Sequence, residues 1–430
     1  MNAKEGKNMD FSRLLEAYCT KETINEFKKK FQGNSVSSFM VNPKYHSDNI
    51  QNQEGIQKDP NDTLLFRFDK EKNRLGKSLE HFAGAYYILD PSSARISYYL
   101  KDLVVKDPIV LDMCAAPGGK SIAFSFRRPD SLIISNDISY TRALEIVKNT
   151  DRLGISNILT MSMDPMEIRS KLDASFDLII LDAPCSGSGM IRKEPKMADD
   201  WSMEKVRRLL PVQENLLKKA YDLVKNDGII CYSTCSLSVE EDEDQVRKFL
   251  KEHPDMEEVK VELKDSGIVE GEFGYHMVPG VFDGEGIYFS ILKKKEGESR
   301  TLKPYRFKEK SPVRDLNAIA YKKNIFLLNR FYQQFETLPF IVCGTKLYDS
   351  SEHPKCLYDH SCSKILDLPV LELEKADAIR YVRGEELKIG SQEKDGLMIA
   401  GYQGLRLGFG KKVKDRFKNY LPKGLKSEVI

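Results

Sequence analysis

The chain has 430 residues, an apolar fraction of 41% and a formal net charge of only +2, so two or three domains with real cores are expected and the overall charge excludes no class of partner. Its eight cysteines are scattered, the residues after Met1 lack an apolar stretch of the secretory type, and no apolar run is long enough to span a bilayer. We therefore expect a reduced, cytoplasmic protein, which argues against structural disulfides.

Residues 1–95 are expected to form a small α/β domain. An amphipathic pattern from Phe11 to Phe31 predicts a helix with Asp10 as its cap. The runs SSFMVNP and LLFRF, the latter from Leu64 to Phe68, predict strands. The polar stretch between them is expected to be a loop.

The next domain, residues 96–294, is expected to be a parallel α/β sheet covered on both faces. Five apolar runs with polar, Pro or Gly turns alternate with helical patterns, which is typical of that fold. The runs are IVLDMCAAP, LIISNDIS, NILTMSMD, FDLIILDAP and GIICYSTCS, and the helical patterns are 120–128, 142–153, 201–224 and 240–252. Two further segments, MEEVKVEL and GIYFSILKKK, are expected to add antiparallel edge strands.

Polar and small residues collect where these strands end, which is where ligands bind in open α/β sheets. The first run leads into a small-residue loop whose backbone a ligand can approach closely. That loop consists of Cys114, Ala115, Ala116, Pro117, Gly118, Gly119 and Lys120. The next three runs end in Asp137, Asp164 and Asp182; an acid after the second strand commonly holds a ribose diol, and Asp164 is placed to accept an adenine amino proton. Without a GxxxxGK[ST] phosphate loop, S-adenosylmethionine is favoured over ATP.

Two cysteines follow neighbouring strands, Cys185 in DAPCSGSG and Cys235 in STCS. A CxxC redox pair is absent, zinc would need further ligands, and inert buried cysteine remains an alternative. Covalent catalysis is favoured, because an Asp-Ala-Pro-Cys turn is not the turn usual in amine methyltransferases. A thiolate that adds to C6 of a pyrimidine makes C5 nucleophilic enough to accept a methyl group. These residues alone do not decide which thiol attacks.

Several motifs together resemble the Fmu/Sun-type RNA cytosine-5 methyltransferases over about residues 76–294. They are YYILDPSSA, DMCAAPGGK, DAPCSGSG, STCS followed by EEDE, and GEGIYF. The resemblance implies a Rossmann-like, S-adenosylmethionine-dependent methyltransferase sheet. It also implies that Cys235 is the nucleophile and that Cys185 assists breakdown of the covalent adduct.

The same resemblance implies that the CAAPGGK loop and the acids Asp137, Asp164 and Asp182 bind S-adenosylmethionine. Asp182 and Lys120 are further expected to orient and activate the target base. The N-terminal domain corresponds to an RNA-binding extension, although residues 42–60 have no clear counterpart.

After a charged segment, residues 295–325, that we expect to be a linker, residues 326–430 form a third unit. The pieces AIRYVRGEEL and GLRLGFGKKVKDRFKNYLPKGLK resemble the PUA-related α/β extension of the branch that modifies bacterial 16S ribosomal RNA. The second piece holds eight Lys or Arg and one acid. With Phe409, Phe417 and Tyr420 interleaved, it predicts a phosphate-contacting stripe with stacking platforms.

A last cluster, His353, Cys356, His360 and Cys362, has residue types that bind zinc but matches no common finger spacing, so ordinary loop residues and no metal are expected. The leading hypothesis is methylation of cytosine C5 in ribosomal RNA, with 16S rRNA or the small subunit as partner, by a monomer that does not bind membranes. The alternatives are the same reaction on tRNA and a non-catalytic RNA-binding assembly factor. The Ala-Pro-Cys turn speaks against an amine or protein methyltransferase.

Overall fold

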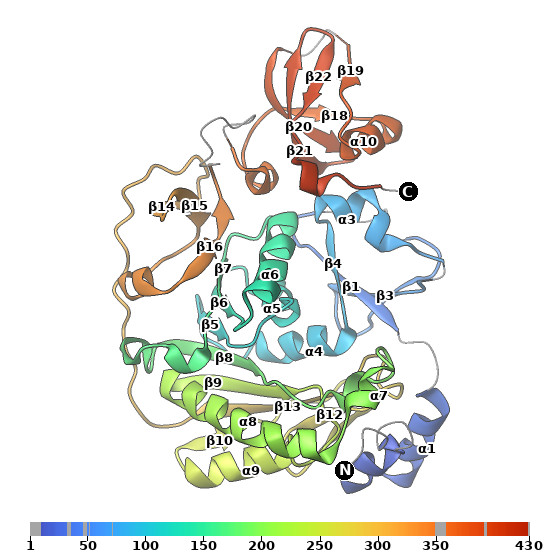
Figure 1. Ribbon diagram of the computed structural model, residues 1–430, viewed down its shortest axis with the longest axis vertical. Helices are drawn as coiled ribbons and strands as arrows, with labels where there is room; N and C mark the ends of the chain where they lie inside the picture. The colour runs from blue at the N-terminus through green and yellow to red at the C-terminus, as the bar shows by residue number, and fades with distance from the viewer. Residues whose placement is uncertain are drawn as a thin grey trace.

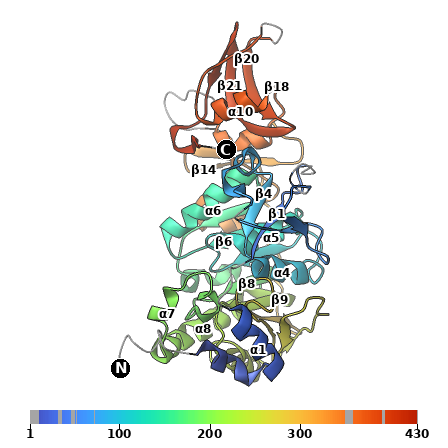
Figure 2. The same cartoon turned by 90° about the vertical axis from the view of Figure 1, so that its right-hand side faces the viewer.

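The structure is a computed structural model that describes residues 10–31, 36–45, 50, 52–70, 72–348, 358–390 and 394–428. The molecule is elongated, with a large central sheet between helices at one end and a β-rich C-terminal domain at the other (Figures 1 and 2). No helix of the described residues is long and apolar enough to cross a membrane.

The five expected strands form the parallel part of the central sheet, in the order β9-β8-β5-β6-β7. They are β5 (Ile109–Asp112), β6 (Leu132–Asn136), β7 (Ile158–Met161), β8 (Phe176–Asp182) and β9 (Val224–Thr234). On the far side of β9 the sheet continues antiparallel with β13 (Ile287–Lys294), β12 (Tyr275–Met277) and β11 (Ile268–Glu270), and β10 (Met256–Glu258) pairs with β13. The two expected antiparallel strands are thus β10 and β13, but β13 is not at the edge, because β12 and β9 pair with it on its two sides.

Helices cover both faces because neighbouring strand residues point to opposite sides. Val110 and Ile133 pack with α4 (Pro91–Leu100) and α5 (Gly119–Arg127), and α6 (Tyr140–Leu153) lies on the same side. Leu111 and Leu132 pack in the core that includes α8 (Met203–Leu223) and α9 (Glu243–Glu252). The loops that follow β5, β6, β7, β8 and β9 therefore meet at one edge.

The N-terminal domain has a four-stranded sheet in the order β2-β3-β1-β4. Its strands are β1 (Ser37–Val41), β2 (Ile56–Lys58), β3 (Leu65–Phe68) and β4 (Tyr86–Leu89), preceded by η2 (Phe11–Ala17) and α1 (Lys21–Lys30), while η3 (Leu75–Lys77) and α3 (Leu79–Ala83) precede β4. The single helix expected from Phe11 to Phe31 was wrong: Asp10 caps the 3-10 helix η2, and Thr20 then caps α1 anew. The stretch expected to be a loop contains β2.

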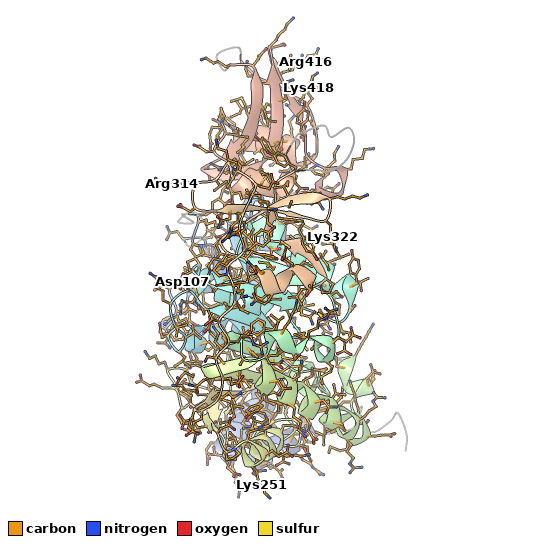
Figure 3. All side chains as sticks on the ribbon, turned by 90° about the vertical axis from the view of Figure 1, so that its left-hand side faces the viewer. Asp107, Lys251, Arg314, Lys322, Arg416 and Lys418 are labelled. Atoms are coloured by element: carbon orange, nitrogen blue, oxygen red, sulfur yellow. The ribbon has the colours of Figure 1, made fainter. Side chains whose placement is uncertain are left out.

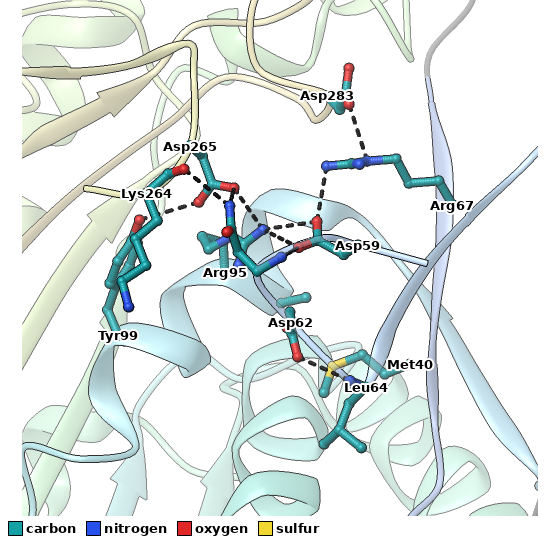
Figure 4. Close-up of polar contacts among 12 residues, drawn as sticks. Met40, Asp59, Asp62, Leu64, Arg67, Arg95, Tyr99, Lys264, Asp265 and Asp283 are labelled. Atoms are coloured by element: carbon teal, nitrogen blue, oxygen red, sulfur yellow. Dashed lines mark hydrogen bonds and ion pairs between the residues drawn. The ribbon is translucent and has the colours of Figure 1, made fainter. Parts of the chain in front are cut away.

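A buried ion network attaches this sheet to α4 and α5, which pack on the central sheet (Figure 4). Arg95 of α4 donates through Nη2 to Asp59 and, at 2.8 Å, to Asp265. Arg67 pairs with Asp59 at 2.9 Å, and Arg127 of α5 donates to both oxygens of Asp62. Asp59 lies in residues 42–60, so this stretch supplies a domain contact that its composition did not predict.

The segment expected to be a linker, residues 295–325, is partly built into the fold. It contains β14 (Asn317–Tyr321), which pairs with β15 (Asn324–Leu328), itself paired with β17 (Thr345–Lys346). The strand β16 (Phe340–Cys343) extends the central sheet along β7. Leu302 and Ile319 are buried in the central core, because a few apolar residues among many charges are enough to fix such a segment.

The C-terminal domain is a five-stranded sheet in the order β18-β20-β21-β22-β19 with one helix. Its elements are η8 (His360–Lys364), β18 (Val370–Glu372), α10 (Lys375–Val382), β19 (Leu387–Lys388), β20 (Gly396–Tyr402), β21 (Leu405–Val413), β22 (Arg416–Asn419) and η9 (Lys423–Leu425). Tyr402 and Leu405 share a core with Leu79 of α3, so this domain packs on the N-terminal one.

Two of the aromatics expected to be stacking platforms are core residues instead. Phe409 is 1% exposed and Phe417 is not exposed. Strand alternation turns Phe417 inward while Arg416 and Lys418 on either side of it face solvent. Tyr420 is half-buried. Of the possible zinc cluster, His353 and Cys356 lie outside the described residues, and the residues that are described contain no group of three or more His, Cys, Asp or Glu arranged to hold a metal ion.

Candidate active site

The CAAPGGK loop turns from the end of β5 into α5 at the carboxyl edge of the sheet. The Ala115 N–H donates to the Asn136 carbonyl at 2.7 Å, and the Gly118 N–H donates to the Ala115 carbonyl at 2.7 Å. Gly118 has φ +104°, which only glycine adopts without strain. A Cβ placed on Gly119 would meet no atom within 4 Å. The loop therefore presents backbone and a helix N-terminus to open space, which fits a ligand such as S-adenosylmethionine.

Asp137 lies directly beside this loop, with a side chain that is only 2% exposed. Its carboxylate accepts the Ala116 N–H at 3.3 Å and the Ser139 N–H at 2.9 Å, and pairs with Arg142 at 3.3 Å. Arg142 also donates to the Ala116 carbonyl at 2.9 Å. Asp137 thus fixes the loop, and Arg142 is a site residue for which the sequence offered no motif.

Large apolar side chains are exposed next to Asp137 and Asp164, two of the acids expected to bind the cofactor. Ile138 is 65% exposed, Tyr140 58% and Met166 48%. Asp164 accepts the Met166 N–H at 2.9 Å and so starts the turn that carries this methionine. Exposed apolar residues beside a small-residue loop suit the faces of an adenine ring. These side chains were not predicted from the sequence, although the apolar residue that follows each acid was a usable signal.

Lys120 and Asp182 form an ion pair between the start of α5 and the end of β8, with Nζ and Oδ2 2.7 Å apart. Burial alone lowers the pKa of the Lys120 ammonium, but the Asp182 carboxylate outweighs burial and raises it. Ser233 donates to the other oxygen of Asp182 at 2.8 Å. Below this pair, burial raises the pKa of Asp112 to about 7. The two residues expected to act together on the target base therefore lie in contact at this edge, although the ion pair itself was not predicted.

The two cysteines lie together, with their Sγ atoms 2.9 Å apart. The Cys235 N–H also donates to the Cys185 sulfur at 3.2 Å. The hydrogen bond with Cys235 and burial, together with the nearby Glu241 and Asp182 carboxylates, raise the pKa of Cys185 well above its usual value. Cys185 is thereby held as a neutral thiol.

The turn that carries Cys185 is held by a buried carboxylate, Glu241, which is not exposed. It accepts the Ser186 N–H at 2.9 Å, the Ser186 hydroxyl at 2.5 Å and the Gln213 amide at 3.1 Å. The Gly189 N–H donates to the Cys235 carbonyl at 2.9 Å and ties this turn to the one that carries Cys235. Glu241 lies in the EEDE segment, but its role as the support of the Cys185 turn was not predicted.

A Rossmann-like sheet with this loop, these strand-end acids and paired thiols defines an S-adenosylmethionine-dependent methyltransferase. Residues 102–293 match the family model of the 16S rRNA methyltransferase RsmB/F, and residues 368–426 match the PUA domain of the methyltransferase RsmF. The chain thus combines a catalytic domain and a PUA domain that match those of this family, and it is an RNA methyltransferase.

Relatives match over most of the chain. The ribosomal RNA small subunit methyltransferase F of Aeromonas salmonicida is 28% identical over 82% of this chain and 81% of its own. That of Psychromonas ingrahamii is 29% identical over 83% and 82%. Among solved structures, a methyltransferase homolog from Pyrococcus horikoshii has 25% identity and a TM-score of 0.54, covering 66% of this chain and 98% of its own. NSun6 from Pyrococcus horikoshii with SFG, at 18% identity and a TM-score of 0.56 over 67% and 98%, shares the fold.

Proposed function

We propose that this methyltransferase modifies C5 of a cytosine in 16S ribosomal RNA, acting as a monomer through a covalent bond between Cys235 and C6 of the base. The observation that carries the proposal is the contact of the Cys185 and Cys235 sulfur atoms, 2.9 Å apart, at the ends of two neighbouring strands. A carbon nucleophile needs covalent activation, which an amine does not. The names of the relatives supply the RNA class.

The two thiols differ in a way that supports separate roles. A thiol that keeps its proton is a poor nucleophile, and the pKa of Cys185 is raised well above its usual value by the hydrogen bond with Cys235 and by burial. We assign the attack to Cys235 because it occupies the STCS motif, which carries the nucleophile in the family that the sequence resembles. Cys185 stands close enough to take part when the C5 proton leaves, the C5–C6 double bond re-forms and the bond from Cys235 to C6 breaks.

Lys120 and Asp182 complete the proposed catalytic group beside the cysteines. The Asp182 carboxylate at the end of β8 is paired with Lys120 but remains 37% exposed. It can therefore still accept a hydrogen bond from the exocyclic amine of an incoming cytosine. Such contacts orient the base and favour addition at C6.

S-adenosylmethionine supplies the methyl group as an electrophile when bound. The residues proposed to hold it are the CAAPGGK loop and the acids Asp137, Asp164 and Asp182. The open space in front of Gly119 and the exposed Ile138 support this placement.

Bisulfite mapping of ribosomal and transfer RNA from a strain that lacks the gene tests the proposal. One or more 16S cytosines should lose their methyl mark and regain it when the purified protein and S-adenosylmethionine are added to RNA or small subunits. Loss confined to tRNA would select the alternative substrate. An unchanged map in both RNA classes would leave the non-catalytic assembly factor.

A further inference from the structure

A cleft lies where three parts of the chain meet, away from the paired cysteines. Its cavity has a volume of about 920 Å³. Its walls come from α3 of the N-terminal domain, the second half of α6, and η8, β21 and η9 of the C-terminal domain. Residues 420–427, which we call the C-terminal segment, lie directly over α3 (Figures 1 and 2). The proposed catalytic group does not use this cleft.

Cationic side chains outnumber acidic ones on these walls. The cations are Lys148, Arg152, Lys364, Lys423 and Lys426, and the acids are Glu145, Asp151 and Asp359. Burial raises the pKa of Asp151 to about 7 and lowers that of Lys364 to about 7, so neither is a full charge at neutral pH. Asp359 is already paired with Lys346 at 3.3 Å. The remaining charge favours an anionic occupant.

The two lysines of the C-terminal segment are available for such an occupant. Lys423 and Lys426 are both exposed, and neither forms an ion pair with any part of the chain that the structure describes. Lys148, by contrast, pairs with Glu145 at 2.7 Å. Phosphates are thus expected to meet Lys423 and Lys426 first.

Half-buried aromatic rings line the same cleft: Phe82, Tyr358 and Tyr420. The Tyr358 ring already stacks on Tyr348, with centroids 5.8 Å apart, so Phe82 and Tyr420 are the rings proposed to meet a base. An aromatic side chain can stack on a nucleic-acid base only where that base is unpaired. Basic side chains interleaved with such rings favour a single strand over a duplex. The cleft thus still combines basic and aromatic side chains, although Phe409 and Phe417, which the sequence suggested as stacking platforms, are buried.

Helix α6 connects this cleft with the cofactor edge. Asn149, on the cleft wall, donates to the carbonyl of Pro117 in the CAAPGGK loop at 3.2 Å. The other end of α6 begins at Tyr140, close to Asp137, and Glu145 on the cleft wall lies only about 8 Å further along the helix. A single RNA strand that runs from the cleft along α6 reaches the catalytic edge of the sheet.

We propose that this cleft between α3, α6 and the C-terminal segment binds a single-stranded stretch of the RNA substrate that flanks the target cytosine. The inference rests on the proposed function. It divides the basic stripe of residues 404–426 into two parts: Lys423 and Lys426 face the cleft, whereas Arg416 and Lys418 lie at the far tip of the domain (Figure 3).

Charge reversal tests the inference in the full-length protein. The variant Lys423→Glu/Lys426→Glu should bind an unstructured single-stranded RNA of 16S sequence roughly tenfold more weakly, as measured by fluorescence anisotropy. The plot of log affinity against log salt concentration should become less steep, by roughly 0.7 for each phosphate that a lysine no longer neutralises. The matched variant Lys248→Glu/Lys251→Glu on α9, at the opposite end of the molecule, changes the net charge equally and should bind RNA almost as well as the wild type.

Two further measurements separate the outcomes. The tip variant Arg416→Glu/Lys418→Glu should lose less affinity than the cleft variant; an equal or larger loss at the tip would overturn the assignment. Affinity for S-adenosylmethionine should stay unchanged in every variant, and Lys423→Gln/Lys426→Gln should show a smaller loss of the same kind. If the wild type binds RNA and the cleft variants bind it equally well, the cleft is not the RNA site. If the wild type neither binds nor methylates RNA, the proposed function itself fails.

Discussion

Arg95 and Asp59 form a fully buried ion pair between the methyltransferase domain and the N-terminal sheet, with Nη2 and Oδ2 2.9 Å apart and both side chains 0% exposed (Figure 4). Removing one partner of such a pair leaves the other charge buried without full compensation. The pair therefore couples the orientation of the N-terminal domain to α4, which packs against α5 on one face of the central sheet.

The substitution Asp59→Ala should lower the free energy of unfolding by about 3–5 kcal/mol, because Arg95 and Arg67 lose their shared carboxylate. Adding Arg95→Met should restore part of that loss, since the buried guanidinium is then gone, and the recovery should be incomplete because Asp265 loses its partner. Urea unfolding followed by circular dichroism measures both. The exposed pair Lys72–Glu54 is the control, and Glu54→Ala should cost about 0–1 kcal/mol. An equally small cost for Asp59→Ala would show that the network does not hold the domains.

Cys185→Ala should accumulate a protein–RNA species that survives denaturing gels, because Cys235 still adds to C6 while release is blocked. Cys235→Ala should be inactive and form no such species, and the double variant should behave like Cys235→Ala. Gel shifts with labelled RNA and S-adenosylmethionine measure this. The reverse pattern, in which only Cys235→Ala traps RNA, would exchange the two roles. If neither variant traps RNA that it binds, Cys185 has no part in release.

Asp137→Ala should weaken S-adenosylmethionine binding by roughly ten- to a hundredfold, since a buried charge-assisted hydrogen bond contributes about 1.5–3 kcal/mol. The loss has two sources: the ribose acceptor, and the bond to the Ala116 N–H that shapes the loop. Calorimetry on folded protein measures the affinity. Arg142→Ala, which keeps the acceptor, should lose less. Unchanged affinity in Asp137→Ala would remove this residue from the cofactor site.

Asp112→Asn should reduce the dependence of stability on pH. Burial raises the pKa of Asp112 from 3.8 in the unfolded chain to about 7, so the folded state holds the extra proton between these values. Stability then falls as pH rises from about 4 to about 7, and the full penalty is present above that range. The variant should gain about 2–3 kcal/mol relative to wild type between pH 5 and pH 8. Urea unfolding at pH 5 and pH 8 measures the free energy of unfolding of both proteins, and Asp102→Asn, at an exposed position, is the control. If Asp112→Asn differs from the wild type by the same free energy at both pH values, the prediction is wrong.

The sequence by itself determined the parallel sheet and the meeting of its loops. Apolar runs that alternate with helical patterns leave few other topologies, and parallel strands bring their carboxyl ends to one edge. Cys185, Cys235, Lys120 and Asp182 were therefore predicted to lie near one another, and their contacts agree. Their catalytic roles stay predictions.

Only the tertiary structure decided which side chains face solvent and which distant segments meet. Phe409 and Phe417 have the spacing of a surface stripe but point into a core formed by other strands. Asp59 lies in a polar stretch, yet it is buried because Arg95, Arg67 and their surroundings compensate its charge. The cleft joins residues from positions 76 to 427. Long-range packing of this kind leaves no local periodicity, so no window of the sequence could have predicted it.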